Sequence, residues 1–213
     1  GGVIAESSGT LTISYAEINA NDNSQAYRTD HVNDNGTGGY TWQMNQNFSD
    51  NANASASFMR AFNSWRCKTG VNWTIGSNTT VNAMVKDGIN IIRFDVGSEL
   101  PAGYGGICQS YFSICGVPKI AYVHELDITF AAAASWQYGP AYPINTQSDF
   151  ETIAVHELGH GHQLAHVISP GAIMHYGASP GTYNRILSYN DLAGAKDVQS
   201  RSVVTNACGP GPM

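Results

Sequence analysis

One short segment, residues 155–166, restricts the possible fold more than any other part of the sequence. It reads VHELGHGHQLAH and contains the pattern HExxH. His156 and His160 are four residues apart, so on a helix both imidazoles lie on one face and can bind one metal ion. Glu157 lies beside that face, where a general base can reach a metal-bound water. The segment therefore predicts a metal-binding helix.

A hydrolytic zinc site holds its metal with three protein ligands and leaves one position open for water. No glutamate follows Glu157 in the chain, which excludes the thermolysin-like class, whose third ligand is a downstream Glu. His166 is the natural candidate. Six residues beyond His160 correspond to about 240° around a helix axis, so His166 would point away from the metal on a continuous helix. We therefore predict that the helix breaks between these two residues.

The residues that follow His166 extend the pattern. Residues 173–177, IMHYG, look like the Met-turn of metzincins, and a His pair on a helix, a break, a third His and a Met-turn together resemble this family of zinc endopeptidases. The resemblance covers about residues 40–200. It includes the segment LSYNDLAGAKDV, which is similar to the last helix of matrixins.

The resemblance implies a role for each residue of the motif. Glu157 would be the general base, Met174 would form a hydrophobic floor under the metal, and Tyr176 would stabilise the oxyanion. The Zn²⁺ ligands would be His156, His160 and His166. Tyr176 matches the Tyr of astacins and serralysins that matrixins usually lack, whereas Val167 stands where astacins carry Glu. The alternative for Tyr176 is a packed side chain whose hydroxyl finds another polar partner.

One position departs from the metzincin pattern HExxHxxGxxH, because Gln163 stands where the pattern has Gly. That Gly allows the left-handed turn at the end of the helix. A non-Gly residue in this conformation costs about 1–2 kcal/mol, which a packed protein can absorb. Two alternatives remain: a catalytically impaired zinc-binding recognition module of the same fold, and an aspzincin-like peptidase with Asp191 as third ligand.

The fold implied by the resemblance is α/β. It has a twisted, mostly parallel metzincin-like sheet with an antiparallel edge strand, a backing helix, an active-site helix and a C-terminal helix. Local patterns place the backing helix at residues 54–65. They predict strands at residues 41–48, 71–75, 90–96 and 119–130. Capping boxes predict that one helix begins at Ser148, with Glu151 three residues on, and that the last begins at Ser188, with Asp191.

The domain organisation follows from length and pattern. With 213 residues the chain has the size of one domain. Residues 40–213 are expected to form the zinc metalloprotease catalytic domain. Residues 1–39 read as an N-terminal extension, either the remnant of a pro-segment or an extra strand, and residues 10–18 show strand-like alternation.

Composition restricts the partners. The formal net charge is −6, and ten Lys and Arg residues are scattered along the chain, so we expect no nucleic-acid or membrane partner. Only 12% of the residues are charged while neutral polar residues are plentiful, which favours a secreted protein. The sequence has no apolar run of about 18 residues and no signal peptide, so we read it as processed. We expect a monomer that acts on proteins or peptides.

The resemblance also suggests where a substrate lies. An extended peptide would pair with an edge strand supplied by residues 116–130, and residues 177–183 would line the pocket beyond the metal. His162 and His175 are expected to lie at the surface or to contact a metal ligand without binding the metal, since neither has the spacing of a ligand.

Cysteine and aspartate residues give two further expectations. Four cysteines without CxxC spacing predict two disulfides, for which we favour Cys108–Cys115 and Cys67–Cys208, with free thiols as the alternative. Matrixins carry structural Ca²⁺, which would place calcium ligands among Asp95, Asp127 and Asp149, although scattered Asp residues are often plain solvated surface.

Overall fold

The computed structural model describes residues 25–27, 40–115, 120–167 and 171–202. Its centre is a six-stranded sheet in the order β1-β6-β4-β2-β3, with β5 paired to β6. All pairs are parallel except β5–β6, which is antiparallel. The strands are β1 (Gln25–Tyr27), β2 (Tyr40–Met44), β3 (Trp73–Ile75), β4 (Asn90–Phe94), β5 (Gly106–Cys115) and β6 (Ile120–Phe130). This mixed α/β architecture confirms the predicted fold class.

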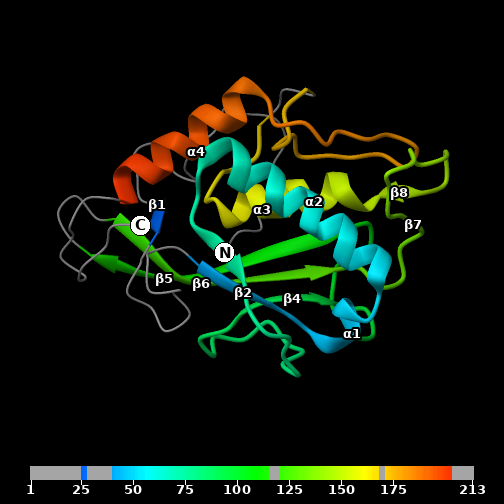
Figure 1. Ribbon diagram of the computed structural model, residues 1–213, viewed down its shortest axis with the longest axis horizontal. Coiled ribbons are helices and arrows are strands. Elements are labelled where there is room, and N and C mark those ends of the chain that lie inside the picture. The colour runs from blue at the N-terminus through cyan, green and yellow to red at the C-terminus, as the bar shows by residue number, and fades with distance from the viewer. Residues whose placement is uncertain (1–24, 28–39, 116–119, 168–170, 203–213) are drawn as a thin grey trace.

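Helices cover one side of this sheet. In Figure 1, α2 (Ala52–Thr69), α3 (Phe150–Gly161) and α4 (Tyr189–Ser202) lie together above the strands. The predicted backing helix is confirmed as part of α2. A short α1 (Gln46–Ser49) and a two-stranded sheet of β7 (Trp136–Gln137) and β8 (Ser148–Asp149) complete the described elements. Among the residues described, no helix combines the length and the apolar character that crossing a bilayer requires.

Aromatic side chains form the core between sheet and helices. Phe130 of β6 and Phe150 of α3 are fully buried, with ring centroids 4.7 Å apart, and Phe48 stacks on Phe130 at 5.9 Å. Burial of such side chains stabilises a fold by about 1.5–3 kcal/mol each. Because Phe150 is the first residue of α3, its burial anchors the start of the helix that carries the HExxH motif.

Helix caps explain where α3 and α4 begin. The side chain of Asp149 accepts a hydrogen bond from the Thr152 N–H at 2.9 Å, so Asp149 caps α3 and the predicted start at Ser148 is wrong by one residue. The predicted box before α4 is confirmed. The Ser188 N–H donates to the Asp191 carboxylate at 2.7 Å, and the Asp191 N–H donates to the Ser188 hydroxyl at 3.2 Å.

The start of the sheet differs from the prediction. The strand predicted at residues 41–48 ends at Met44, because Asn45 caps α1 by accepting a hydrogen bond from the Asn47 N–H at 2.9 Å. Within the predicted N-terminal extension, β1 pairs with β6 from Gln25 opposite Ala121. The strand predicted at residues 10–18 lies outside the described residues.

The predicted edge strand is also different. β6 is internal, since it pairs with β5 on one side and with β4 and β1 on the other. β5 is the antiparallel edge, so the assignment of the edge to residues 116–130 is wrong, and residues 116–119 are not described. β5 and β6 are neighbours in sequence, but β6 is internal because it also pairs with β1 and β4, which are distant in sequence and which local patterns do not encode.

The favoured Cys108–Cys115 disulfide is not formed. Cys108 and Cys115 lie on the same continuous strand, β5, where seven residues of extended chain separate two Cα atoms by about 23 Å, far beyond the reach of a disulfide. Cys108 is a buried free thiol and Cys67 is an exposed free thiol. Cys208, the predicted partner of Cys67, lies outside the described residues.

Candidate metal centre

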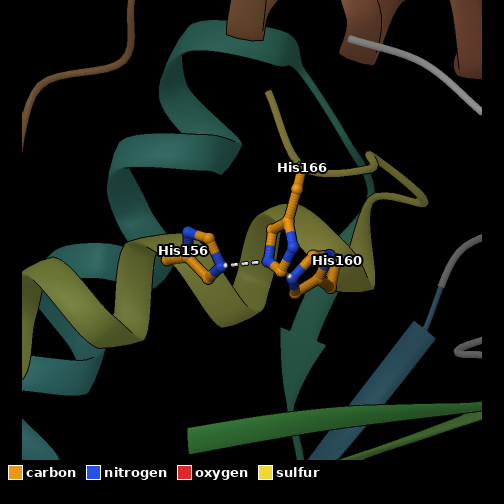
Figure 2. Close-up of side chains that lie close together, drawn as sticks. All are labelled: His156, His160 and His166. Carbon is orange, nitrogen blue, oxygen red and sulfur yellow. Dashed lines mark hydrogen bonds between the residues drawn. The ribbon is translucent and has the colours of Figure 1, made fainter. Parts of the chain in front are cut away.

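Three histidine side chains converge at the end of α3. His156 and His160 lie on α3, and His166 follows it (Figure 2). The Nε2 atoms of His156 and His160 each lie 3.1 Å from Nε2 of His166. A tetrahedral ion with Zn–N distances of about 2.0–2.1 Å holds its nitrogen ligands about 3.3 Å apart, so this spacing fits one zinc ion.

The backbone after α3 makes this convergence possible. The helix ends at Gly161, and Gln163 has φ 65°, in the left-handed region. The Leu164 N–H then donates to the carbonyl of Gly159 at 3.0 Å, and the Val167 N–H donates to the carbonyl of Met174 at 2.8 Å. The predicted break between the second and third histidines is therefore confirmed, and it occurs at the position where the metzincin pattern has Gly.

Backbone carbonyls hold the first two imidazoles in one tautomer. Nδ1 of His156 lies 2.8 Å from the Ile173 carbonyl oxygen, and Nδ1 of His160 lies 2.8 Å from that of Leu164. A carbonyl only accepts, so both Nδ1 atoms carry the hydrogen and both Nε2 atoms present a lone pair. His166 can offer at most one hydrogen to these two lone pairs, whereas one cation can satisfy all three nitrogens.

Burial keeps the histidines neutral. It lowers the pKa of His156 to about 4 and that of His160 well below its ordinary value. Burial, followed by the charge of His175, lowers the pKa of His166 to about 4. Three neutral imidazoles at neutral pH are ready to bind a metal ion without first losing protons.

Glu157 lies at the same site in an apolar setting. Its side chain is buried, and burial raises the pKa of its carboxyl to about 8, while a hydrogen bond from the Cys108 backbone N–H acts in the opposite direction. Gly106 lies directly against it, since a Cβ atom at that position would be 3.1 Å from Glu157 Oε1. The start of β5 therefore borders the carboxylate.

Met174 lies beneath the helix at Gly159. It is fully buried, and a Cβ atom on Gly159 would overlap its Sδ atom and lie 3.2 Å from Trp65 Cζ2. Only glycine at this position lets Met174 approach α3 this closely.

An open cleft of about 560 Å³ runs past these residues. Its walls come from residues 103–107 ahead of and within β5, from α3, and from the segment between residues 172 and 184. Tyr176 lines the cleft and is 55% exposed. The expected pocket wall is confirmed for five of its residues: Gly177, Ala178, Ser179, Thr182 and Tyr183.

Comparison with known proteins agrees with this geometry. The sequence model of the matrixin family matches residues 34–199, which is more than half of the chain. The chain belongs to the matrixin family. Matrixins are metzincins, so the predicted resemblance is confirmed, and membership makes the chain a zinc metallopeptidase by class, with proteins or peptides as substrates. No curated protein matches the sequence.

Asp191 does not join the matrixin metal site. Its carboxylate accepts hydrogen bonds from the N–H groups of Ile173 and Ser188, at 3.1 and 2.7 Å. Among the described residues, the group of His, Cys, Asp and Glu side chains placed to share one ion is His156, His160 and His166.

Of the two histidines expected outside the ligand set, His162 differs from the expectation and His175 agrees with it. His162 is fully buried between Trp65 and Trp73, with ring centroids 5.2 and 5.0 Å away, so it belongs to the core rather than the surface. His175 lines the cleft, and its Nδ1 lies 2.8 Å from the Gly177 carbonyl oxygen.

Sequence reasoning missed the contribution of β5 to the matrixin site. Gly106 and Cys108 contact Glu157, and Ser110 contacts Gln163. The Gly105–Gly106 pair was the available signal, because glycine in or beside a strand often marks a close approach of another group.

Proposed function

We propose that this matrixin is a secreted zinc-dependent endopeptidase in which His156, His160 and His166 bind the metal. The observation that carries the proposal is the convergence of three Nε2 atoms on one wall of a cleft that Glu157 also borders. Zinc in such a site supplies Lewis acidity, which lowers the pKa of a bound water to about 7 and polarises a carbonyl group.

Glu157 is proposed as the general base. Its side chain lines the same cleft as the three histidines, which is where a base that serves a metal-bound water must lie. It would take a proton from the attacking water and pass it to the leaving amine. The Cys108 N–H and the backbone at Gly106 would hold its orientation.

Tyr176 is proposed to stabilise the oxyanion. It stands on the cleft wall formed by the segment after His166, where its exposed side chain, whose ring lies 4.5 Å from that of His175, would face a bound carbonyl. Peptide substrates would lie along β5, the antiparallel edge of the sheet, because an exposed edge offers unpaired backbone N–H and C=O groups.

The decisive experiment compares the wild type with Glu157→Gln, prepared identically. Zinc content is measured by atomic emission, and cleavage is measured on casein and a peptide library. We expect about one zinc per chain in both proteins and cleavage by the wild type alone. If the wild type holds zinc and cuts nothing, the endopeptidase proposal fails and the recognition-module alternative replaces it.

Secretion and a monomeric state complete the proposal. The low content of charged residues, 12%, supports an extracellular location. Fractionation of the producing cells should place the protein in the medium, and light scattering should give a mass near 22.8 kDa for this chain.

A structural Ca²⁺ is proposed at Asp127. Asp149 is ion-paired with Arg185, and Asp95 accepts from the Ala132 N–H. Asp127 accepts from the Ile91 N–H at 3.4 Å and differs from both in being buried beside a second buried carboxylate, that of Glu125. Two neighbouring carboxylates in a buried place favour a cation.

A further inference from the structure

β5 meets the metal centre at three alternate residues. Gly106 lies against Glu157, Cys108 donates its N–H to the same carboxylate, and the hydroxyl of Ser110 contacts Gln163. Alternate residues of a strand face the same side of the sheet. One side of β5 therefore contacts both the proposed base and the turn that leads to the third histidine.

Gln163 makes its part of this contact from a strained position. It is 2% exposed, and its φ of 65° lies in the region that favours glycine. Its Nε2 lies 3.2 Å from the Ser110 hydroxyl and 3.2 Å from the carbonyl oxygen of His160. The two amide hydrogens of Gln163 can thus be donated at once, one to the Ser110 hydroxyl of β5 and one to the backbone carbonyl of His160, a proposed metal ligand.

We infer that Gln163 is a positioning residue that fastens the turn between His160 and His166 to Ser110 of β5. The inference rests on the proposed function. Where the metzincin pattern has Gly, the turn has no side chain with which to reach the strand. In this chain the Gln163 amide links the turn to β5. Because Glu157 also contacts β5, the same strand fixes the position of the metal ligands relative to Glu157.

The test uses Gln163→Gly, Ser110→Ala and the double variant, each loaded with Co²⁺ in place of zinc. The visible absorption of Co²⁺ reports ligand geometry without any need for activity. We expect both single variants to shift the spectrum and to lower kcat for a peptide about fivefold, the equivalent of one net hydrogen bond, with KM nearly unchanged. The kcat of the double variant should be no lower than that of the less active single variant, because both substitutions remove the same hydrogen bond.

Two further variants separate positioning from general destabilisation. Ser110→Thr keeps a hydroxyl and should restore the wild-type spectrum and kcat. Thr74→Ala removes a comparable hydrogen bond elsewhere in the sheet, the 3.1 Å contact between the hydroxyls of Thr41 on β2 and Thr74 on β3. It should lower the melting temperature while leaving the spectrum and kcat unchanged.

The inference is overturned if Ser110→Ala leaves both the Co²⁺ spectrum and kcat unchanged, or if the effects of the two single variants simply add. A wild type that cuts no peptide, combined with spectra that shift as described, would remove the proposed function and leave the positioning role of Gln163 supported.

Discussion

Gly106 and Glu157 are in such close contact that a Cβ atom at residue 106 would lie 2.9 Å from Cγ of the glutamate. One residue belongs to the edge strand and the other to the HExxH helix. The position of the carboxylate therefore depends on the backbone of β5 and on the absence of a side chain there.

Replacing Gly106 with alanine should displace the carboxylate. Because a shift of about 1 Å in a catalytic group can lower the rate about 100-fold, we expect a loss of this order in kcat/KM, and destabilisation by about 1–3 kcal/mol. Peptide kinetics, zinc content and chemical denaturation measure these effects. Gly171→Ala is the matched control, since a Cβ atom there meets nothing within 4 Å. Wild-type kinetics for Gly106→Ala would show that the contact does not position Glu157.

Removing His166 should abolish tight zinc binding. Zinc at 1,000 times its Kd stabilises a folded protein by about 4 kcal/mol, and His166→Ala should lose most of this thermal shift. Asp191→Ala removes a helix cap, so it should lower stability by about 0.5–2 kcal/mol and change zinc affinity by no more than about tenfold. The opposite ranking of the two variants in a chelator competition would favour the aspzincin-like alternative.

The stability of the calcium-free protein should depend on the ionisation of Asp127. Burial, followed by the charge of Glu125, raises its pKa to about 8, against 3.8 ordinarily, so the folded state holds the proton more tightly than the unfolded state. Its contribution is complete below about pH 4 and is lost as the pH rises to about 8. Urea unfolding between pH 4 and 9 should show this fall in the wild type and a smaller fall in Asp127→Asn.

Added Ca²⁺ provides the complementary measurement. If Asp127 is a calcium ligand, millimolar Ca²⁺ should restore stability at pH 8 in the wild type and have no effect on Asp127→Asn. Equal responses of the two proteins would remove Asp127 from the calcium proposal.

The two described thiols should react very differently. Cys67 is exposed and Cys108 is fully buried, where burial raises the pKa of its thiol. Only the thiolate reacts quickly, so a maleimide should label Cys67 in the native protein and Cys108 only after unfolding. Peptide mapping after timed labelling distinguishes them. A Cys67 that stays unlabelled until a reductant is added would instead indicate a disulfide.

Local signals predicted the elements whose determinants are close in sequence. The box formed by Ser188 and Asp191 predicted the start of α4, and the four-residue spacing of His156 and His160 predicted their shared face. The break before His166 followed from helix geometry alone. These inferences needed only the period of a helix and its capping chemistry.

Elements that depend on distant contacts were not predictable in the same way. β5 is the edge rather than β6 because β6 also pairs with the distant strands β4 and β1, and the residues of β5 at the site include serine and cysteine, which carry no clear strand signal. Gln163 was predicted only as tolerable strain at a glycine position, and its partner Ser110 lies 53 residues away. The strand predicted at residues 41–48 ends before Asn45 because Asn45 caps α1, and strand propensity takes no account of such a capping hydrogen bond.

The packing of Trp65 gives the protein an internal optical reporter. Its indole N–H donates to the carbonyl of Val155, one residue before His156, and its ring lies against the imidazole of His162. Its emission is therefore set by the two segments that position the metal ligands. Trp73 lies against the same imidazole, so two of the four tryptophans of the chain would shift their emission to longer wavelength if this helix end loosened.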